Sequence, residues 1–177
     1  MRRLMAFVLV MSGFAANARS QGPKATTVDD GALRQIEAET ARLEQANDTS
    51  IARYFADDWV CACPRALSKR EFVANVRSNR DTHEDGINPY TIEKRNMVVH
   101  VFGDTAVVTY IKEYRQATPP SASLSNRFVT GFKFAKYSPE TTRFFQEDDT
   151  DVFTRDSVGW HLRLTKISLV QQQAASK

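Results

Sequence analysis

Apolar residues recur at helical spacing in the first part of the chain. In the segment 29–47, DDGALRQIEAETARLEQAN, one stripe consists of Leu33, Ile36, Thr40 and Leu43. Charged residues occupy most of the other positions, so an amphipathic helix is predicted here. Asp48 follows at a position from which its side chain can cap a second, short helix over 49–58.

A short strand and a third helix are predicted next. The strand covers 59–64, WVCACP, and Pro64 either ends it or marks a sheet edge. In the segment 67–79, Ser68 and Glu71 form the S-x-x-E pattern of a capping box. This pattern indicates where the third helix begins.

Beyond the third helix, apolar and polar residues alternate with a period of two, which is typical of half-buried strands. Strands are predicted over 90–102, 105–116, 127–137, 142–155 and 159–170. Gly103 and Asp104 form a tight hairpin turn between the first two. Helices followed by long antiparallel strands indicate an α+β domain, with the helices on one face of a curved sheet.

Residues 1–18 have the features of a signal peptide. Arg2 and Arg3 precede an apolar run, and the small residues at 16–18 allow cleavage before Arg19. The run of about 13 apolar residues is short for a membrane span. We therefore expect export to the periplasm or the medium of a bacterium; an uncleaved anchor is the alternative.

Removal of this leader changes the charge balance. The chain has 177 residues, with 24 Lys and Arg against 21 Asp and Glu, and residues 1–18 contain two of the bases and no acid. The mature chain therefore has 22 bases and 21 acids, a net charge of +1. Such a chain has little electrostatic attraction for nucleic acid or anionic lipid. No later segment is apolar enough for membrane insertion after signal cleavage.

The length fits one domain of ordinary size. We expect this single domain over 30–170. A flexible lead-in at 19–29 would precede it, and a tail at 171–177 would follow it.

Cys61 and Cys63 are the only cysteines of the chain. In an extended strand their Cα atoms would be about 6.5 Å apart, at the upper end of disulfide geometry. We therefore favour two buried free thiols, with a strained or intermolecular disulfide and a reactive thiol as alternatives. A metal site is disfavoured, because C-x-C lacks the second ligand pair of a structural zinc site and His83, His100 and His161 are far apart in the sequence.

Carboxylates gather in the predicted strand 142–155. Alternation places Glu147, Asp149 and Asp151 on one face and Asp148 on the other. The favoured interpretation is a solvated outer face, paired with Lys and Arg of neighbouring strands. In the alternative, the three carboxylates lie in a pocket and raise one another's pKa, and Asp149 or Asp151 acts as an acid or base.

Neighbouring strands carry other polar candidates. Tyr110 shares a face with Tyr114 and could offer its hydroxyl to a ligand. On the last strand, alternation groups Lys166 with Trp160 and Leu162, which makes Lys166 a candidate for an interior cation. The chain contains no phosphate-binding glycine loop, dinucleotide fingerprint or nucleophile elbow, so no cofactor is expected.

Four strings carry a resemblance: IEAETARLEQANDTSIARYFADDWV, LSKREFV, VHVFGDTAVVTY and DTDVFTRDSVGWHLRLTKIS. In this order and spacing they resemble the nuclear transport factor 2-like superfamily, nearest to its SnoaL-like branch. The resemblance implies a cone-shaped fold in which a curved antiparallel sheet and N-terminal helices enclose a pocket. It also implies that dimerisation through the sheet is common. The segment 117–142 is longer than is usual in the family and would add an aromatic hairpin, for local packing or as a rim of the pocket.

Ketosteroid isomerase is the informative relative. In that enzyme, an ADD string is followed by a strand whose last residue before a proline is the carboxylate general base. In this chain the ADD string is residues 56–58, and Pro64 follows at the same spacing. The position of the general base therefore falls on Cys63. The tyrosine of its first helix corresponds to Glu39 or Thr40. Both working groups are therefore replaced, which argues against steroid isomerase chemistry. The residues expected to line the pocket are Phe55, Trp59, Cys61, Cys63, Phe72 and Tyr110.

The sequence thus predicts an exported domain that binds a small apolar or amphipathic molecule, forms a homodimer and lacks a complete catalytic set. One alternative is an acid–base enzyme, such as an isomerase, cyclase or hydratase, that uses Asp151, Tyr110 or Lys166. Another is an envelope protein-interaction module. A pocket of about 300 Å³ or more would favour the enzyme, and a cone filled by its own side chains would argue against both ligand-binding interpretations.

Overall fold

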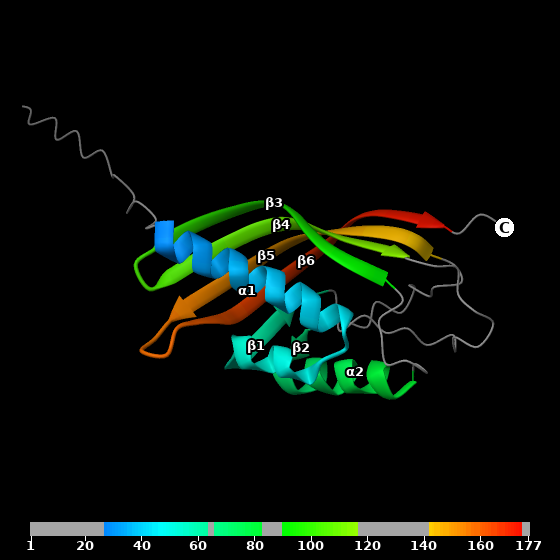
Figure 1. The fold of residues 1–177 in the computed structure, drawn as a ribbon, viewed down its shortest axis with the longest axis horizontal. Helices are drawn as coiled ribbons and strands as arrows, with labels where there is room; N and C mark the ends of the chain where they lie inside the picture. Colours follow the sequence, from blue (N-terminus) through cyan, green and yellow to red (C-terminus); the bar gives the residue numbers. More distant parts are fainter. Residues whose placement is uncertain (1–26, 64–65, 83–89, 117–141, 175–177) are drawn as a thin grey trace, which may run out of the picture.

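A curved six-stranded sheet forms the body of the molecule, and α1 lies across its concave face (Figure 1). The computed structural model describes residues 27–63, 66–82, 90–116 and 142–174. In chain order the elements are α1 (Thr27–Gln45), the 3-10 helix η1 (Thr49–Tyr54), β1 (Phe55–Ala62), β2 (Leu67–Ser68), α2 (Lys69–Thr82), β3 (Tyr90–Phe102), β4 (Thr105–Gln116), β5 (Thr142–Arg155) and β6 (Trp160–Ala174).

The strands are arranged in the order β2-β1-β6-β5-β4-β3. Neighbouring strands are antiparallel except β1 and β6, which are parallel. The sheet is therefore mixed rather than wholly antiparallel as predicted, because the last strand returns beside the first long one. The predicted α+β class and cone-shaped fold are confirmed.

The N-terminal helix is longer at its start than predicted. α1 begins at Thr27, so the end of the lead-in expected at 19–29 is already helical. Asp48 caps η1 as predicted, since its carboxylate accepts a hydrogen bond from the Ser50 backbone N–H at 2.8 Å. This bond satisfies one of the amide groups that would otherwise be unpaired at the helix start.

β1 begins at Phe55, inside the segment that was predicted to end the second helix. Phe55 pairs with Leu162 of β6, and the Lys69 ammonium group donates to the Phe55 carbonyl at 2.7 Å. These partners are distant in sequence, and they satisfy backbone groups that a longer helix would have paired locally. Local periodicity could not reveal them.

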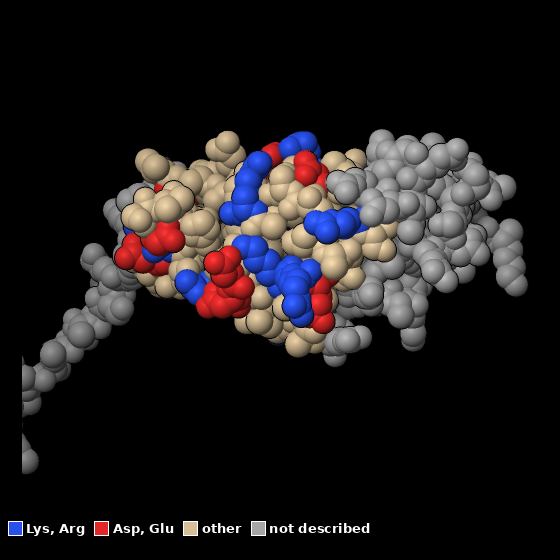
Figure 2. All heavy atoms as spheres, turned by 90° about the horizontal axis from the view of Figure 1, so that it is seen from below, with Lys and Arg blue, Asp and Glu red and all other residues tan. Residues whose placement is uncertain are grey.

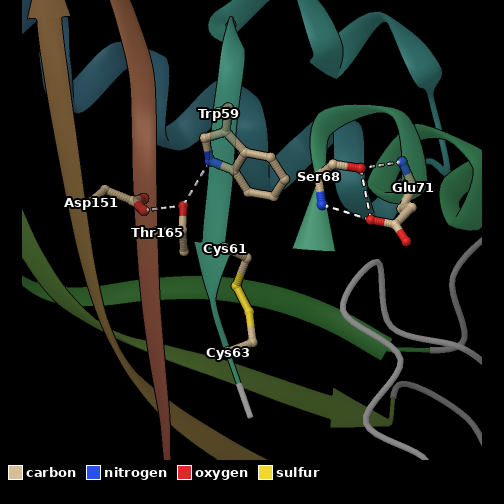
Figure 3. The surroundings of a disulfide bond; sticks show 7 residues. All are labelled: Trp59, Cys61, Cys63, Ser68, Glu71, Asp151 and Thr165. Atoms are coloured by element: carbon tan, nitrogen blue, oxygen red, sulfur yellow. Dashed lines mark hydrogen bonds between the residues drawn. A yellow bond between two sulfur atoms is a disulfide. The ribbon is translucent and has the colours of Figure 1, made fainter. Parts of the chain in front are cut away.

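The capping box predicted at the start of α2 is confirmed. The Ser68 N–H donates to Glu71 Oε2 at 2.9 Å, and the Glu71 N–H donates to Ser68 Oγ at 3.4 Å (Figure 3). The two residues therefore satisfy each other's amide groups, and the helix begins at Lys69.

The long strands agree closely with the alternation pattern. β3, β4 and β5 have the predicted bounds. Gly103, in the turn between β3 and β4, has a φ of 64°, which glycine adopts without a steric penalty. β6 continues to Ala174, so residues 171–174 pair with β5 and are not part of a tail as predicted.

Several predictions lie outside the described residues. They are the signal peptide at 1–18, the strand over 127–137 and nearly all of the extended segment 117–142. Among the described helices, none combines the length and apolar character needed to cross a bilayer.

Two apolar clusters support the sheet. In the larger one, Phe55 stacks on Trp59 with ring centroids 4.7 Å apart, and Phe72 lies 5.2 Å from Phe55 and 5.5 Å from Trp59. In the smaller one, the rings of Tyr114 and Phe145 stack at 4.1 Å. Aromatic packing of this kind fixes β1, α2 and the long strands relative to one another.

Candidate functional site

Three carboxylates of β5 point into the cone. Glu147, Asp149 and Asp151 are no more than 2% exposed, whereas Asp148 is exposed on the outer face. The solvated outer face favoured from the sequence is therefore wrong for these three residues. Alternation identified the set, but the face that α1 covers depends on tertiary packing.

α1 contributes two more carboxylates, Glu37 and Glu44, which are also buried. Lys94 of β3 pairs with Glu37 and donates to the Thr40 hydroxyl at 3.0 Å. Lys112 of β4 pairs with Glu44 at 2.6 Å. Each lysine therefore forms a buried ion pair between the helix and the sheet, a geometry that needs further hydrogen bonds to offset desolvation.

Tyrosines of β4 lie beside both ion pairs. Lys94 Nζ is 4.6 Å from the ring centroid of Tyr110, and Lys112 Nζ is 5.0 Å from that of Tyr114. The Tyr114 hydroxyl donates to Glu44 at 3.0 Å. Burial and the surrounding carboxylates raise the pKa of both tyrosine hydroxyls, so both remain protonated donors.

Asp151, like Glu44, has a hydrogen-bond donor at each carboxylate oxygen. The Tyr110 hydroxyl donates to its Oδ2 at 2.7 Å, and the Thr165 hydroxyl donates to its Oδ1 at 2.5 Å. Trp59 Nε1 in turn donates to the Thr165 oxygen at 3.2 Å (Figure 3). Both carboxylate oxygens of Asp151 therefore have a hydroxyl donor.

Other interior carboxyl groups are not satisfied in this way. In the part of the chain that the structure describes, both oxygens of Glu147, both oxygens of Asp149 and Oε1 of Glu37 have no hydrogen-bond partner. Each buried polar group left unsatisfied costs about 1–3 kcal/mol, and more if it is charged. β5 thus presents acceptors that nothing described in the interior satisfies.

In the described parts of the chain, five carboxyl groups share this interior with two ammonium groups. Burial raises the pKa of Glu37 to about 8, although Lys94 opposes the shift. Burial also raises the pKa of Glu147 to about 7, against the effect of Lys112. The pKa of Asp149 is raised by burial and by the neighbouring Glu147. These groups therefore retain protons at a pH where exposed carboxyl groups have lost theirs.

A small cavity lies among these side chains. Its volume is about 20 Å³, enough for one water molecule and far below the size of ordinary ligand pockets. Its lining combines polar and apolar side chains: Thr40, Glu44, Ile51, Phe55, Phe72, Lys94, Tyr110, Lys112, Asp149, Asp151, Leu162 and Thr165. Most of the cone is thus filled by the protein's own side chains.

Three of the residues expected to line a pocket, Phe55, Phe72 and Tyr110, line this cavity. Trp59 and Cys61 are buried in the surrounding apolar cluster, and the partly buried Cys63 packs against it. Trp59 nevertheless reaches the site through its bond to Thr165, described above. The predicted wall thus lies partly at the cavity and partly behind it.

Lys166 is not an interior cation. It is exposed, and its neighbour Thr165 is buried in its place. A register irregularity in the pairing of β6 with β5, next to Leu162, reverses the alternation before Thr165. A shift of one residue moves every following side chain to the other face, so the prediction from uninterrupted alternation is wrong.

Cys61 and Cys63 form a disulfide (Figure 3), so the expectation of free thiols is also wrong. β1 ends at Ala62, and Cys63 lies in the bend that follows. The bend brings the Cα atoms to 5.3 Å, within the usual disulfide range, whereas a continued strand would hold them farther apart.

The sequence analysis missed four charged residues of the site: Glu37, Glu44, Lys94 and Lys112. A signal existed in α1, because Leu33, Glu37, Thr40 and Glu44 follow the i, i+4, i+7, i+11 spacing of one buried helix face. Polar residues on such a face indicate a polar interior. The lysines gave no comparable signal, because alternation alone cannot distinguish a covered face from an open one.

Charges of both signs are intermixed on the outer face that Figure 2 shows. In Figure 2, Lys and Arg side chains lie next to Asp and Glu side chains over the face that carries α2. Arg163 pairs with Asp58 at 2.5 Å, and Lys69 pairs with Asp57 at 3.0 Å. Within the described residues, no group of His, Cys, Asp and Glu is placed to hold a metal ion.

Comparisons with solved structures identify the fold. An NTF2-like protein of unknown function from Pseudomonas putida is 16% identical, with a TM-score of 0.60 over 85% of this chain and 95% of that one. An NTF2-like protein with a cystatin-like fold from Novosphingobium aromaticivorans is 17% identical, with a TM-score of 0.58 over 81% and 83% of the two chains. The association domain of CaMKII from C. elegans is 14% identical, with a TM-score of 0.56 over 80% and 95%.

Neither a sequence model of a known protein family nor a curated protein sequence matches this chain. The nuclear transport factor 2-like resemblance is confirmed at the level of the fold. The SnoaL-like branch stays a prediction. Identities this low show the fold alone, so the function has to be argued from the interior.

Proposed function

We propose that this protein is an exported domain that binds a small amphipathic molecule inside its cone. The observation that carries this proposal is Asp149, which lines the cavity, is 1% exposed and has no hydrogen-bond partner for either carboxylate oxygen in the described chain. A ligand that donates hydrogen bonds would satisfy these oxygens and offset the cost of burying them.

The small volume of the cavity, about 20 Å³, argues against both a binding domain and an enzyme for a small molecule. The unsatisfied carboxylates argue in their favour, because a cone that served only as a scaffold would gain stability from an apolar filling. A molecule larger than water requires side chains between α1 and the sheet to move, because the cavity holds about one water molecule. The apolar part of such a ligand would contact Phe55 and Phe72.

The cysteines support export independently of the leader. Disulfides form and persist in oxidising compartments such as the periplasm and the medium, and are rare in the cytosol. The Cys61–Cys63 disulfide is therefore consistent with removal of residues 1–18 during export.

Mass spectrometry of the protein purified from its own bacterial envelope tests both parts. Under native conditions we expect a mass that exceeds a whole number of chains by the mass of a small molecule, and this excess is lost on denaturation. Under denaturing, non-reducing conditions we expect a chain that starts at Arg19 and is two hydrogens lighter than its reduced form. A native mass equal to a whole number of bare chains contradicts ligand binding, and a retained leader contradicts export with cleavage.

A second candidate function is protein association. The similar structures favour it, because they include the association domain of C. elegans CaMKII and a putative association domain of the same kinase type from Exiguobacterium sibiricum. Exposed apolar residues on the sheet also favour it: Val98 and Phe102 of β3 and Leu164 of β6. An association module would use the outer sheet face and leave the interior without a ligand. The native mass measurement separates the two through the small excess mass: ligand binding leaves it on top of whole chains, and association alone leaves none.

A further inference from the structure

The charge of the interior identifies a ligand class for the proposed site. Among the described residues, five carboxyl groups of α1 and β5 lie around two ammonium groups, those of Lys94 and Lys112. With every group ionised, the interior would carry an excess of three negative charges. Excess charge in a medium of low dielectric constant must be neutralised by protons or by a cation.

The hydrogen bonds and ion pairs of the interior leave the excess negative charge on two neighbouring residues of β5. Lys94 pairs with Glu37, Lys112 pairs with Glu44, and Asp151 accepts hydrogen bonds from two hydroxyl groups. The carboxylates that remain are Glu147 and Asp149, two residues apart on the same face of β5. Neither has a hydrogen-bond partner of good geometry in the described chain, because the Tyr114 hydroxyl near Glu147 donates its one proton to Glu44. Asp149 lines the cavity.

Residues on the neighbouring strands do not satisfy this pair. In the strand register, Lys112 lies opposite Glu147 and Tyr110 opposite Asp149. The hydroxyl of Tyr110 is directed to Asp151, and the ammonium group of Lys112 bonds to Glu44. The donors nearest in register are therefore already bonded elsewhere.

We infer that the molecule bound in the cone carries a primary ammonium group, which Asp149 and Glu147 hold through charge-assisted hydrogen bonds. This inference rests on the proposed ligand-binding function. An ammonium group offers three N–H donors and a positive charge, which match acceptor-only oxygens with excess negative charge. A neutral hydroxyl group would supply donors without the charge.

The volume of the cavity and the residues that line it also favour an ammonium group. The cavity of about 20 Å³ admits a group the size of water, which an ammonium head group is. A metal ion is disfavoured, because the described His, Cys, Asp and Glu residues form no ligand cluster. The remainder of the amine would extend towards the apolar lining at Phe55, Phe72 and Leu162.

Binding of the cation is coupled to loss of protons. The titratable groups that interact with this pair are Glu44 of α1, Lys94 of β3, Tyr110, Lys112 and Tyr114 of β4, and Asp151 of β5. Burial raises the pKa of Glu147 to about 7 and that of Asp149 above its usual range, so both groups bind protons when the site is empty. The cation displaces these protons, and the affinity for the amine therefore rises with pH until the carboxyl groups are ionised. Simple amines, with a pKa near the 10.4 or so of lysine, stay protonated throughout.

Isothermal titration calorimetry with methylammonium chloride tests this inference on the full mature chain. We expect saturable binding that tightens from pH 6 to pH 8, with proton release detected as a dependence of the heat on the buffer. Tetramethylammonium has the same charge without N–H donors, and sodium is the ionic control; neither should bind. The Asp149→Asn variant keeps the shape of the side chain and removes its charge, and should weaken methylammonium binding by about tenfold or more.

Asp148→Asn is the matched control, because Asp148 is the exposed neighbour on the opposite face of β5. It should leave methylammonium affinity unchanged. Asp149→Asn removes an unsatisfied buried carboxyl group, so it should unfold at the same temperature as wild type or higher, which separates lost binding from lost folding.

Equal heats for methylammonium and sodium, or wild-type affinity in Asp149→Asn, would overturn the ammonium assignment. If native mass spectrometry then detects a retained neutral or anionic molecule, the proposed ligand-binding function stands and only the ligand class fails. If no molecule is retained and methylammonium does not bind, both fail.

Discussion

At the scale of single residues, the buried carboxyl groups of β5 make stability depend on pH. Glu147 is fully buried, and its pKa is raised from 4.5 to about 7. In the unfolded chain the group loses its proton near pH 4.5, whereas in the folded protein it keeps the proton to about pH 7. Its stabilising contribution is therefore complete below pH 4.5 and is lost as the pH rises to about 7.

The Glu147→Gln variant should remove this dependence. We expect its free energy of unfolding to exceed that of wild type by up to about 3 kcal/mol at pH 8, with little difference at pH 4.5. Urea denaturation at the two pH values measures the difference. Asp148→Asn serves as the exposed control and should change stability by less than about 0.5 kcal/mol. Equal pH profiles for Glu147→Gln and wild type would contradict the buried, proton-binding state of Glu147.

At the scale of elements, the capping box determines where α2 begins. Ser68 and Glu71 exchange hydrogen bonds at the junction of β2 and α2. Loss of such a cap leaves amide groups of the first turn without a protein partner.

The Ser68→Ala variant should lower the free energy of unfolding by about 1 kcal/mol, within the usual range of 0.5–2 kcal/mol for caps. Thermal and urea denaturation measure this change. Ser157→Ala is a suitable control, because Ser157 is exposed in the turn between β5 and β6. If both variants match wild type, the box contributes nothing to the stability of α2.

In β6, one irregularity of strand register changes which side chains face the interior. The change of register near Leu162 turns Thr165 inward and Lys166 outward. Thr165 then supplies the hydroxyl group that links Trp59 to Asp151. The polar interior therefore depends on a bulge as much as on the identity of its residues.

At the scale of the whole molecule, the outer face of the sheet is the expected dimer surface. Val107 of β4 lies opposite His100 of β3 and Val152 of β5, and Val152 lies opposite Leu164 of β6. This row of mostly apolar residues crosses the sheet on the side away from α1. An apolar row on the open side of a sheet fits a self-complementary contact between two copies.

We expect a homodimer in solution, measured by size-exclusion chromatography with light scattering. Val152→Arg should produce a monomer with an unchanged circular dichroism spectrum, because a two-fold contact brings each new charge near its copy. Val158→Arg is the control, since Val158 is 84% exposed in the turn before β6. A monomeric wild type, or a dimeric Val152→Arg, would argue against this surface.

The sequence determined the local structure of much of the chain. The bounds of β3, β4 and β5, the Asp48 cap and the Ser68–Glu71 box follow from periodicity and from contacts within a few residues. The fold class followed as well, through the order of the elements and the resemblance of their strings. Such features depend on neighbours along the chain, which a sequence displays directly.

Tertiary structure alone decided the character of the interior. Alternation grouped Glu147, Asp149 and Asp151, but only the position of α1 made their face the buried one. The start of β1 at Phe55 and the inward side chain of Thr165 depend on strand pairings between residues far apart in sequence. Pattern reasoning reads local periodicity, whereas burial and charge balance result from elements that meet only in the folded chain.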